Sequence, residues 1–296
     1  MMHDQAQQLR DRMLKKKNRE EHKAKTLAII SGKGGVGKSN FALNFSIALK
    51  ERQQRVLLFD LDIGMGNIDI LIGKSASRNL VDLFEGNVSL KHILTKGPEA
   101  LEYIAGGSGL AELFQLDEHR FHHFLSEFEA ISKFYDFVIF DMGAGVTNDS
   151  LKFILAAEEA ILVTTPEPTA LTDGYAILKY IHQLQRNMNI YMLINRASDI
   201  QTGKETLNRF QRAGKQFLNK ELYPLGILPD DPNVGKAVVS QVPFLQFNRK
   251  SSASQALLQM TDQYLDGSIT INRFAENGFV DRLKRLISLQ GKGAWK

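Results

Sequence analysis

The sequence contains no cysteine, and this absence excludes disulfide bonds, thiolate zinc sites and iron–sulfur clusters together. It also lacks any apolar run approaching the ~20 residues that a membrane-spanning helix needs. The first 25 residues are polar and basic, without an apolar central region, so we expect no cleavable signal peptide. What is present is an ordinary globular composition, with 43% hydrophobic residues in a chain of 296, which is enough for one large domain with a sizeable core.

Short apolar runs alternate along the chain with longer helical stretches. Near-continuous apolar runs are typical of strands buried on both faces of a parallel sheet, and the stretches between them supply crossover helices. The runs expected to form strands are Leu27–Ile30, Arg55–Asp60, Leu101–Ala105, Asp136–Asp141, Ala160–Thr164, Ile190–Asn195 and Leu222–Leu228. The pattern predicts an α/β fold with a doubly wound, mostly parallel sheet flanked by helices over residues 24–268, with tails at 1–23 and 269–296.

The first of these strands leads into a glycine-rich loop. Gly32 is followed after four residues by Gly37-Lys38-Ser39, which is the phosphate-binding P-loop pattern. Glycines let backbone N–H groups turn toward a phosphate, and a helix expected over Phe41–Lys50 adds its N-terminal dipole. Lys38 is expected to reach the outer phosphates, and the Ser39 hydroxyl to hold Mg²⁺. The sequence therefore predicts that ATP or ADP binds with Mg²⁺ at Gly32, Lys33, Gly34, Gly35, Val36, Gly37, Lys38, Ser39 and Asn40.

A second lysine, Lys33, follows the first glycine of the loop. An ordinary P-loop does not need it, and the run from Gly32 to Ser39 resembles the deviant Walker A family, which includes MinD, the ParA partition ATPases, nitrogenase iron protein and the arsenite ATPases. In that family the extra lysine crosses a dimer interface and contacts the partner's nucleotide. The resemblance implies a homodimer that forms with ATP, with Lys33 and Lys38 as catalytic residues. The lack of cysteine separates this chain from the iron proteins, cluster scaffolds and arsenite pumps, which need that residue.

Carboxylates follow the second and fourth expected strands. Ligands of such sheets bind at the carboxyl ends of the strands, where acids can hold Mg²⁺ and orient water. By resemblance to the first switch of MinD, Asp62 is the catalytic, water-orienting residue, Asp60 lies beside the metal and Asn67 is a switch residue. Asp141 takes the Walker B position, and Gly143 belongs to the second switch, where relatives often carry proline. The expected metal-site residues are Ser39, Asp60, Asp62 and Asp141.

The residues expected near the adenine follow the sixth and seventh strands. An asparagine side chain offers both a donor and an acceptor, and Asn195 matches the adenine-reading residue of the family, with Arg196 beside the base. The run Pro229-Asp230-Asp231 resembles the loop that closes over the base. On residues alone, Asn195 can equally be a turn former after a strand.

The C-terminal tail has an amphipathic pattern. Helical spacing over 279–289 places five apolar side chains on one face, namely Phe279, Val280, Leu283, Leu286 and Ile287. Residues 279–296 carry five Lys or Arg against one acid, so such a helix can lie in an anionic membrane interface, with Trp295 at the headgroups. Two copies in a dimer would bind far better than one. The alternative is a final helix docked on its own domain, and both states can alternate with the nucleotide.

The N-terminal tail reads Asp4-Gln-Ala-Gln-Gln-Leu-Arg10, and residues 10–25 carry eight Lys or Arg. Such a tail before a MinD-like ATPase, with a membrane-type helix at the far end, resembles the flagellar-number regulators of the FlhG family, also called FleN or YlxH. In that family the N-terminal segment stimulates FlhF, a signal-recognition-particle-type GTPase, and flagellar C-ring proteins are further partners. The resemblance gives Gln5, Gln8, Leu9 and Arg10 as GTPase-activating contacts, and the alternative is a solvated basic tail.

Together these observations predict a slow ATPase that cycles between an ADP-bound monomer and an ATP-bound dimer and regulates flagellar number and placement. We expect it in the cytoplasm, reversibly peripheral on the inner face of the cell membrane, with its two tails acting as independent outputs. A ParA-like DNA-partitioning ATPase would share the nucleotide site, but the C-terminal helix argues against it, and we expect no nucleic-acid partner. A metabolic ligase of the dethiobiotin synthetase type would share the fold, although nothing in the sequence marks its substrate pocket.

Overall fold

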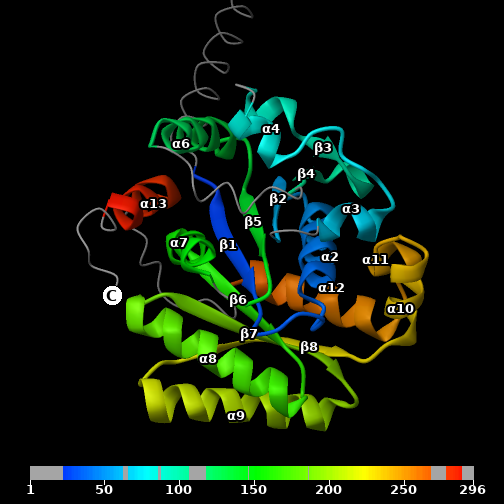
Figure 1. The fold of residues 1–296 in the computed structure, drawn as a ribbon. Helices are drawn as coiled ribbons and strands as arrows, with labels where there is room; N and C mark the ends of the chain where they lie inside the picture. Colours follow the sequence, from blue (N-terminus) through cyan, green and yellow to red (C-terminus); the bar gives the residue numbers. More distant parts are fainter. Residues whose placement is uncertain are drawn as a thin grey trace, which may run out of the picture.

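The computed structural model describes residues 23–62, 66–85, 88–106, 118–145, 147–185, 187–267 and 278–288. These residues form an eight-stranded sheet in the order β3-β4-β2-β5-β1-β6-β7-β8 (Figure 1). Neighbouring strands are parallel except for β3 and β4. The strands are β1 (Lys25–Ile30), β2 (Val56–Leu61), β3 (Thr95–Lys96), β4 (Glu102–Ile104), β5 (Phe137–Met142), β6 (Glu159–Thr164), β7 (Asn189–Ala197) and β8 (Tyr223–Pro229).

The predicted fold class is confirmed, and each of the seven expected strands lies within two residues of its predicted ends. The central strands β2, β5 and β6 are buried at every position, as the near-continuous apolar runs indicated. The antiparallel strand β3 was not predicted. It is only two residues long, Thr95–Lys96, and therefore carries no apolar run to reveal it.

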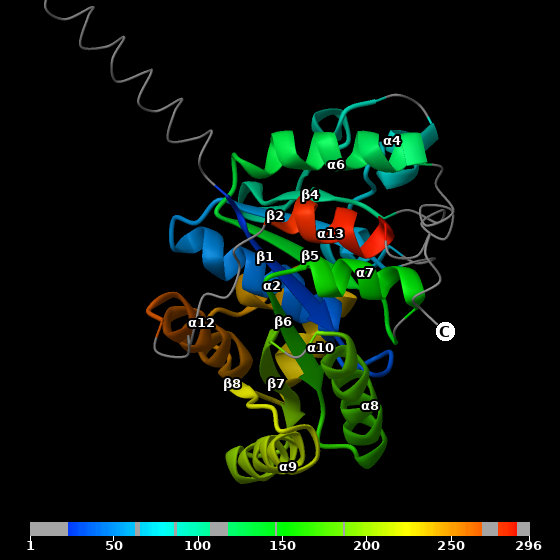
Figure 2. The ribbon, with the colours of Figure 1, turned by 90° about the vertical axis from the view of Figure 1, so that its left-hand side faces the viewer.

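Helices cover both faces of the sheet. They are α2 (Lys38–Glu51), α3 (Asn67–Ile72), α4 (Leu80–Glu85), α6 (Glu118–Ser132), α7 (Asn148–Ala156), α8 (Pro168–Leu184), α9 (Ile200–Leu218), α10 (Pro232–Val239), α11 (Phe244–Phe247), α12 (Ser252–Leu265) and α13 (Phe279–Ser288), with 3₁₀ turns η1 (Leu90–His92) and η2 (Pro98–Ala100). Side chains of α6, α7, α8 and α13 share one core with the sheet, and those of α2, α11 and α12 share the other. Figures 1 and 2 show this doubly wound arrangement.

The final described helix, α13, lies on the domain rather than apart from it. Its Phe279 ring is 4.7 Å from that of Phe128 and 4.9 Å from that of Phe140, and Leu283 is completely buried. The other predicted members of the apolar face, Val280, Leu286 and Ile287, pack partly buried against the same core. The face predicted for a membrane is thus docked here, which is the alternative that the sequence left open.

Among the described helices, none combines the length and the apolar character needed to cross a bilayer. The boundaries proposed at residues 23/24 and 268/269 stay predictions.

Candidate nucleotide-binding site

The glycine-rich loop lies at the carboxyl end of β1, and two of its glycines have left-handed backbones. Gly35 has φ 79°, and Gly37, with φ 88°, is the residue that precedes α2. A Cβ on Gly37 would lie 2.3 Å from Nδ2 of Asn195, so no larger residue fits there without a shift. Gly32 is equally restricted, because its Cβ would lie 2.3 Å from the backbone carbon of Asp173 in α8. The loop is therefore fixed from two sides, by β7 and α8.

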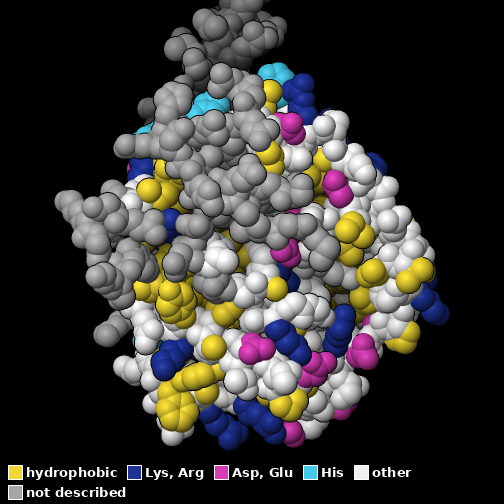
Figure 3. Space-filling model, in the orientation of Figure 1, with side chains coloured by type: hydrophobic (Ala, Val, Ile, Leu, Met, Phe, Trp, Pro, Cys, Tyr) yellow, Lys and Arg dark blue, Asp and Glu magenta, His cyan; other side chains and the backbone are white. Residues whose placement is uncertain are grey.

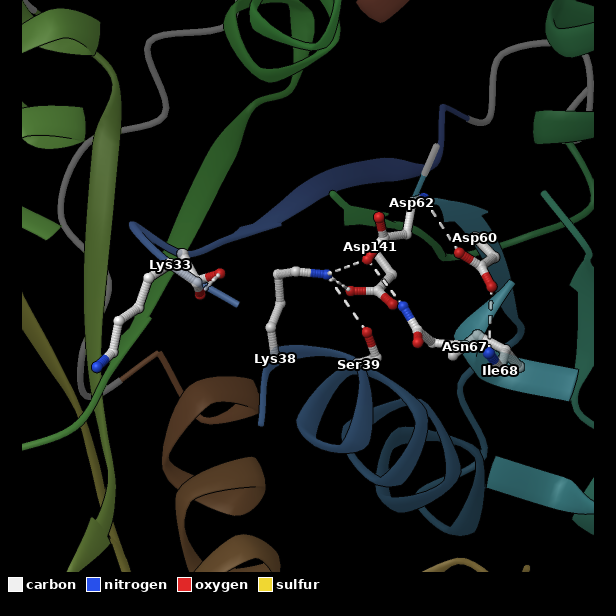
Figure 4. Close-up of polar contacts among 9 residues, drawn as sticks. Lys33, Lys38, Ser39, Asp60, Asp62, Asn67, Ile68 and Asp141 are labelled. Atoms are coloured by element: carbon white, nitrogen blue, oxygen red, sulfur yellow. Dashed lines mark hydrogen bonds and ion pairs between the residues drawn. The ribbon is translucent and has the colours of Figure 1, made fainter. Parts of the chain in front are cut away.

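The phosphate end of the site centres on Lys38, which is buried. Its Nζ donates to Oδ1 of Asp141 at 2.6 Å and to Oγ of Ser39 at 3.3 Å, and lies 4.0 Å from Oδ2 of Asp62 (Figure 4). Asp141 is completely buried, and its other oxygen, Oδ2, has no hydrogen-bond partner among the described residues. Four predicted residues from three separate segments thus meet here, as expected from the edge of a parallel sheet.

These residues fit a magnesium nucleotide. Mg²⁺ is usually bound by one or two carboxylates together with phosphates and waters. Ser39 and the unpaired oxygen of Asp141 are the groups that would hold the ion there. Among the described residues, no group of three His, Asp or Glu side chains is arranged to hold a metal ion. The phosphates and waters would therefore complete its coordination.

The first switch segment is organised around Asp62. Asn67 donates from Nδ2 to Oδ2 of Asp62 at 2.8 Å, a contact that links the end of β2 to the start of α3. Burial raises the pKa of Asp62, while the charge of Lys38 and the Asn67 hydrogen bond oppose that rise. Gly143 of the second switch lies against the same carboxylate, since a Cβ there would be 3.1 Å from Oδ1 of Asp62. The two switch segments are therefore in contact.

Asp60, the residue predicted beside the metal, accepts hydrogen bonds from the backbone of the first switch segment. Its two oxygens accept from the backbone N–H groups of Asp62 and Ile68, both at 3.1 Å (Figure 4). Burial, together with the neighbouring charge of Asp141, raises the pKa of the Asp60 carboxyl. In this structure Asp60 holds the first switch in shape, and its metal contact stays a prediction.

Lys33 lies away from this cluster (Figure 4). Its Nζ pairs with Oε2 of Glu167 at 2.7 Å and donates to Oγ1 of Thr169 at 2.9 Å. Sequence reasoning missed both partners. They follow β6, so the rule used for Asp62 and Asp141, that residues after a strand line the site, would have drawn attention to them.

At the other end of the site, the residues predicted for the adenine lie together. Asn195 donates from Nδ2 to the backbone oxygen of Val36 at 2.7 Å, and its Oδ1 accepts from the N–H of Arg196 at 2.9 Å. The N–H of Asp230 donates to the oxygen of Ala197 at 2.8 Å, which fixes the Pro229–Asp231 loop beside them. Each end of the Asn195 amide can form one further hydrogen bond, so its contact with a base stays a prediction.

Asp231 is buried and engaged by the protein. It accepts hydrogen bonds from the N–H of Asn233 in α10, and from the Ser252 hydroxyl and the N–H of Ala253 in α12. Burial would raise the pKa of this carboxyl, but the hydrogen bonds outweigh that effect and lower it. The side chain thus joins two helix starts, and the predicted place of Asp231 in the loop over the base stays a prediction.

The predicted GTPase-activating residues Gln5, Gln8, Leu9 and Arg10 lie outside the described residues.

Comparisons with known proteins agree with this geometry. A family model described as an AAA domain matches residues 24–194. The antiactivator FleN of Pseudomonas aeruginosa is 32% identical over 246 residues, which cover 82% of this chain and 88% of FleN. The flagellum site-determining protein YlxH of Helicobacter pylori is 30% identical over 252 residues, which cover 81% of this chain and 80% of YlxH.

A solved structure supports the fold. The septum site-determining protein MinD of Pyrococcus horikoshii, in complex with Mg-ADP, superposes with a TM-score of 0.65 at 23% identity, covering 84% of this chain and 100% of that one. Together with the P-loop, its second lysine and the paired switch segments, these similarities show that the chain belongs to the MinD/ParA-type ATPases, in the group that contains FleN and YlxH.

Proposed function

We propose that this ATPase is a nucleotide-driven switch that regulates flagellar number and placement. The similarity to FleN, an antiactivator, and to YlxH, a flagellum site-determining protein, supports the biological assignment. The observation that carries the switch is the contact of Asp62 with Gly143 beside the Lys38–Asp141 pair. A phosphate that binds Lys38 brings negative charge close to Asp141 and Asp62, so both switch segments respond when the terminal phosphate arrives and leaves.

The roles at the site follow from this arrangement. When bound, Mg-ATP supplies the phosphoryl group and a metal charge that neutralises its oxygens. Lys38 stabilises the charge that develops on the phosphates, and Asp62, held by Asn67, orients the attacking water. Lys33 exchanges Glu167 for the nucleotide of a second subunit, so that ATP joins two copies face to face. The switch is tested by measuring the mass in solution with ATP and with ADP: a dimer with ATP and a monomer with ADP is the expected result, and equal masses would contradict it.

The C-terminal helix is the proposed membrane anchor of the ATP-bound dimer. Its apolar face packs on α6 and α7, so membrane binding requires α13 to leave the domain. The exposed side of the helix carries Lys284, which would remain available to anionic headgroups. The dimer presents two such helices, and linking two weak sites raises the overall affinity without any new contact.

Neutralising the exposed cation Lys284 should weaken membrane binding without disturbing the docked helix. Each basic residue near an anionic surface contributes about 1 kcal/mol, and Lys284→Gln removes one from each helix of the dimer, so the affinity for anionic vesicles should fall about thirtyfold in the ATP state. Sedimentation with vesicles measures this, and Trp295, the single tryptophan, reports insertion by its fluorescence. The matched control is Lys215→Gln on the exposed side of α9, which removes the same charge elsewhere. Equal losses in both variants would point to non-specific charge attraction.

Removal of residues 272–296 tests the same anchor by deleting the whole helix. It should abolish ATP-dependent vesicle binding while ATP-dependent dimerisation persists. It also exposes the core beneath Phe279, so the charge variants are the sharper experiment.

The N-terminal segment is the proposed activator of an FlhF-type GTPase, and C-ring proteins are proposed as further partners. A peptide of residues 1–23 should raise GTP hydrolysis by the partner on its own, because a glutamine can position water in another active site. The same peptide with Gln5→Ala and Gln8→Ala is the control and should be inert. The activator role fails if the unchanged peptide has no effect at saturating concentration.

The DNA-partitioning alternative gains no support from the visible surface. On the described part of the face shown in Figure 3, basic and acidic side chains are interspersed rather than gathered into one basic area. Binding to duplex DNA depends on many phosphate contacts and falls steeply with salt. Co-sedimentation with DNA in place of vesicles, in the presence of ATP, would favour the alternative.

A further inference from the structure

The two tails join the domain at neighbouring points, Lys23 for the N-terminal tail and Gly278 for the C-terminal tail, and we call these points the roots of the tails. A Cβ built on Gly278, the residue before α13, would be 3.8 Å from Nζ of Lys23 and 3.9 Å from its Cδ. The stem of Lys23 therefore runs along the backbone from which α13 starts. Lys23 is also the first described residue after the N-terminal segment. The start of β1 and the helix α13 are neighbours in both ribbon views (Figures 1 and 2).

The Glu158 carboxylate interacts with charged side chains at both roots. Its backbone N–H donates to the oxygen and the hydroxyl of Thr26 at 3.0 and 3.1 Å, which fixes Glu158 beside β1. Oε1 of Glu158 lies 3.9 Å from Nη2 of Arg282 in α13, and the charges of Lys25 and Lys23 also act on it. Lys25 already pairs with the adjacent Glu159 at 3.0 Å. The carboxylate of Glu158 thus lies beside Arg282 of α13, and the charge of Lys25 at the start of β1 acts on it more strongly than that of Lys23.

The pair between Glu158 and Arg282 is only partly satisfied. Both side chains are largely buried, and neither Nε nor Nη2 of Arg282 has a hydrogen-bond partner among the described residues. Burial lowers the pKa of Arg282 and raises that of Glu158, so each charge loses hydration and depends on the other. Removing one member of such a pair leaves an uncompensated buried charge, which is strongly destabilising.

We propose that Glu158 couples the two tails, so that release of α13 also releases the root of the N-terminal segment. When α13 leaves, Lys23 loses the backbone of Gly278 along which it packs, and Glu158 loses Arg282. The root of the N-terminal segment is then no longer held against the start of α13. This differs from the independence expected from the sequence, and for its biological outcome it rests on the proposed function: the membrane-bound form is the form that presents the GTPase-activating segment.

The test uses the full-length chain, whose lack of cysteine allows single labels. A nitroxide is placed on His22→Cys or, in a second protein, on Asp281→Cys, an exposed position of α13. Glu158→Gln should raise the mobile fraction of both labels severalfold, because Arg282 is left buried without a counter-charge. Glu158→Gln/Arg282→Gln should restore both spectra, since the buried charge is gone. Lys284→Gln, an exposed charge on the same helix, should change neither.

Mobility of the α13 label with no change at position 22 would overturn the coupling, and so would an unchanged α13 label in Glu158→Gln. If Glu158→Gln fails to fold, Leu283→Asp undocks α13 through its apolar face and must still mobilise the label at 22. No membrane or GTPase is present in these measurements. If both labels become mobile together but the protein does not bind vesicles, the membrane role is refuted and the coupling is not.

Discussion

Lys33→Ala should bind ATP nearly as well as the unchanged protein and yet remain a monomer. The Lys33 ammonium pairs with Glu167 and Thr169 rather than with the Lys38 cluster, so its loss leaves the phosphate site intact. Lys38 is buried at that site and donates to Asp141 and Ser39. Since hydrogen bonds to charged groups contribute about 1.5–3 kcal/mol each, Lys38→Ala should weaken ATP binding about a hundredfold.

Analytical sedimentation with ATP and with ADP, together with direct ATP binding, separates these two lysines. Lys204→Ala removes an exposed lysine from α9 and is the matched control, with dimerisation expected to be unchanged. A Lys33→Ala protein that dimerises normally with ATP would contradict the proposed contact of Lys33 with the nucleotide of the second subunit. Loss of ATP binding in the same variant would instead place Lys33 in the phosphate site of its own subunit.

Asp62→Ala should bind ATP, accumulate as a dimer and fail to turn over. A group that orients or deprotonates the attacking water typically contributes 10²–10⁴-fold to the rate, so hydrolysis should fall at least a hundredfold. Asn67→Ala should lower the rate by less, because it removes only the hydrogen bond that positions the Asp62 carboxylate. Rates of phosphate release and the mass in ATP measure both effects. If Asp62→Ala hydrolyses ATP near the original rate, the residue that orients the attacking water must instead be Asp60 or Asp141.

The sheet and the P-loop could be predicted because their signals are local. A run such as Phe137–Phe140 is apolar, which is typical of a strand buried on both faces, so the run itself contains that information. The glycines of the loop are required by backbone geometry within a few residues. That Lys38, Asp62 and Asp141 lie together then followed from the rule that sites form at the carboxyl ends of parallel strands. No knowledge of individual residue contacts was needed.

The details that could not be predicted are contacts between distant segments. Asp231 stands in a run that resembles a base-closing loop, but its partners at Ser252 and Ala253 lie on another helix. The pairing of Lys33 with Glu167 spans more than a hundred residues of chain. Docking of α13 is the clearest case, since an amphipathic face suits a lipid surface and a protein core equally well. The sequence of the helix does not show that the rings of Phe128 and Phe140 lie where the helix can cover them.

The docked helix also means that membrane affinity is a property of the whole fold. A helix that is free for ~1% of the time binds lipid about a hundredfold more weakly than the free helix would, because only the open fraction competes. The open fraction depends on the aromatic contacts of Phe279, including Phe153 at 6.0 Å. Substitutions of Phe128 or Phe153, which would never touch lipid, are therefore a means by which evolution can adjust the proposed membrane binding.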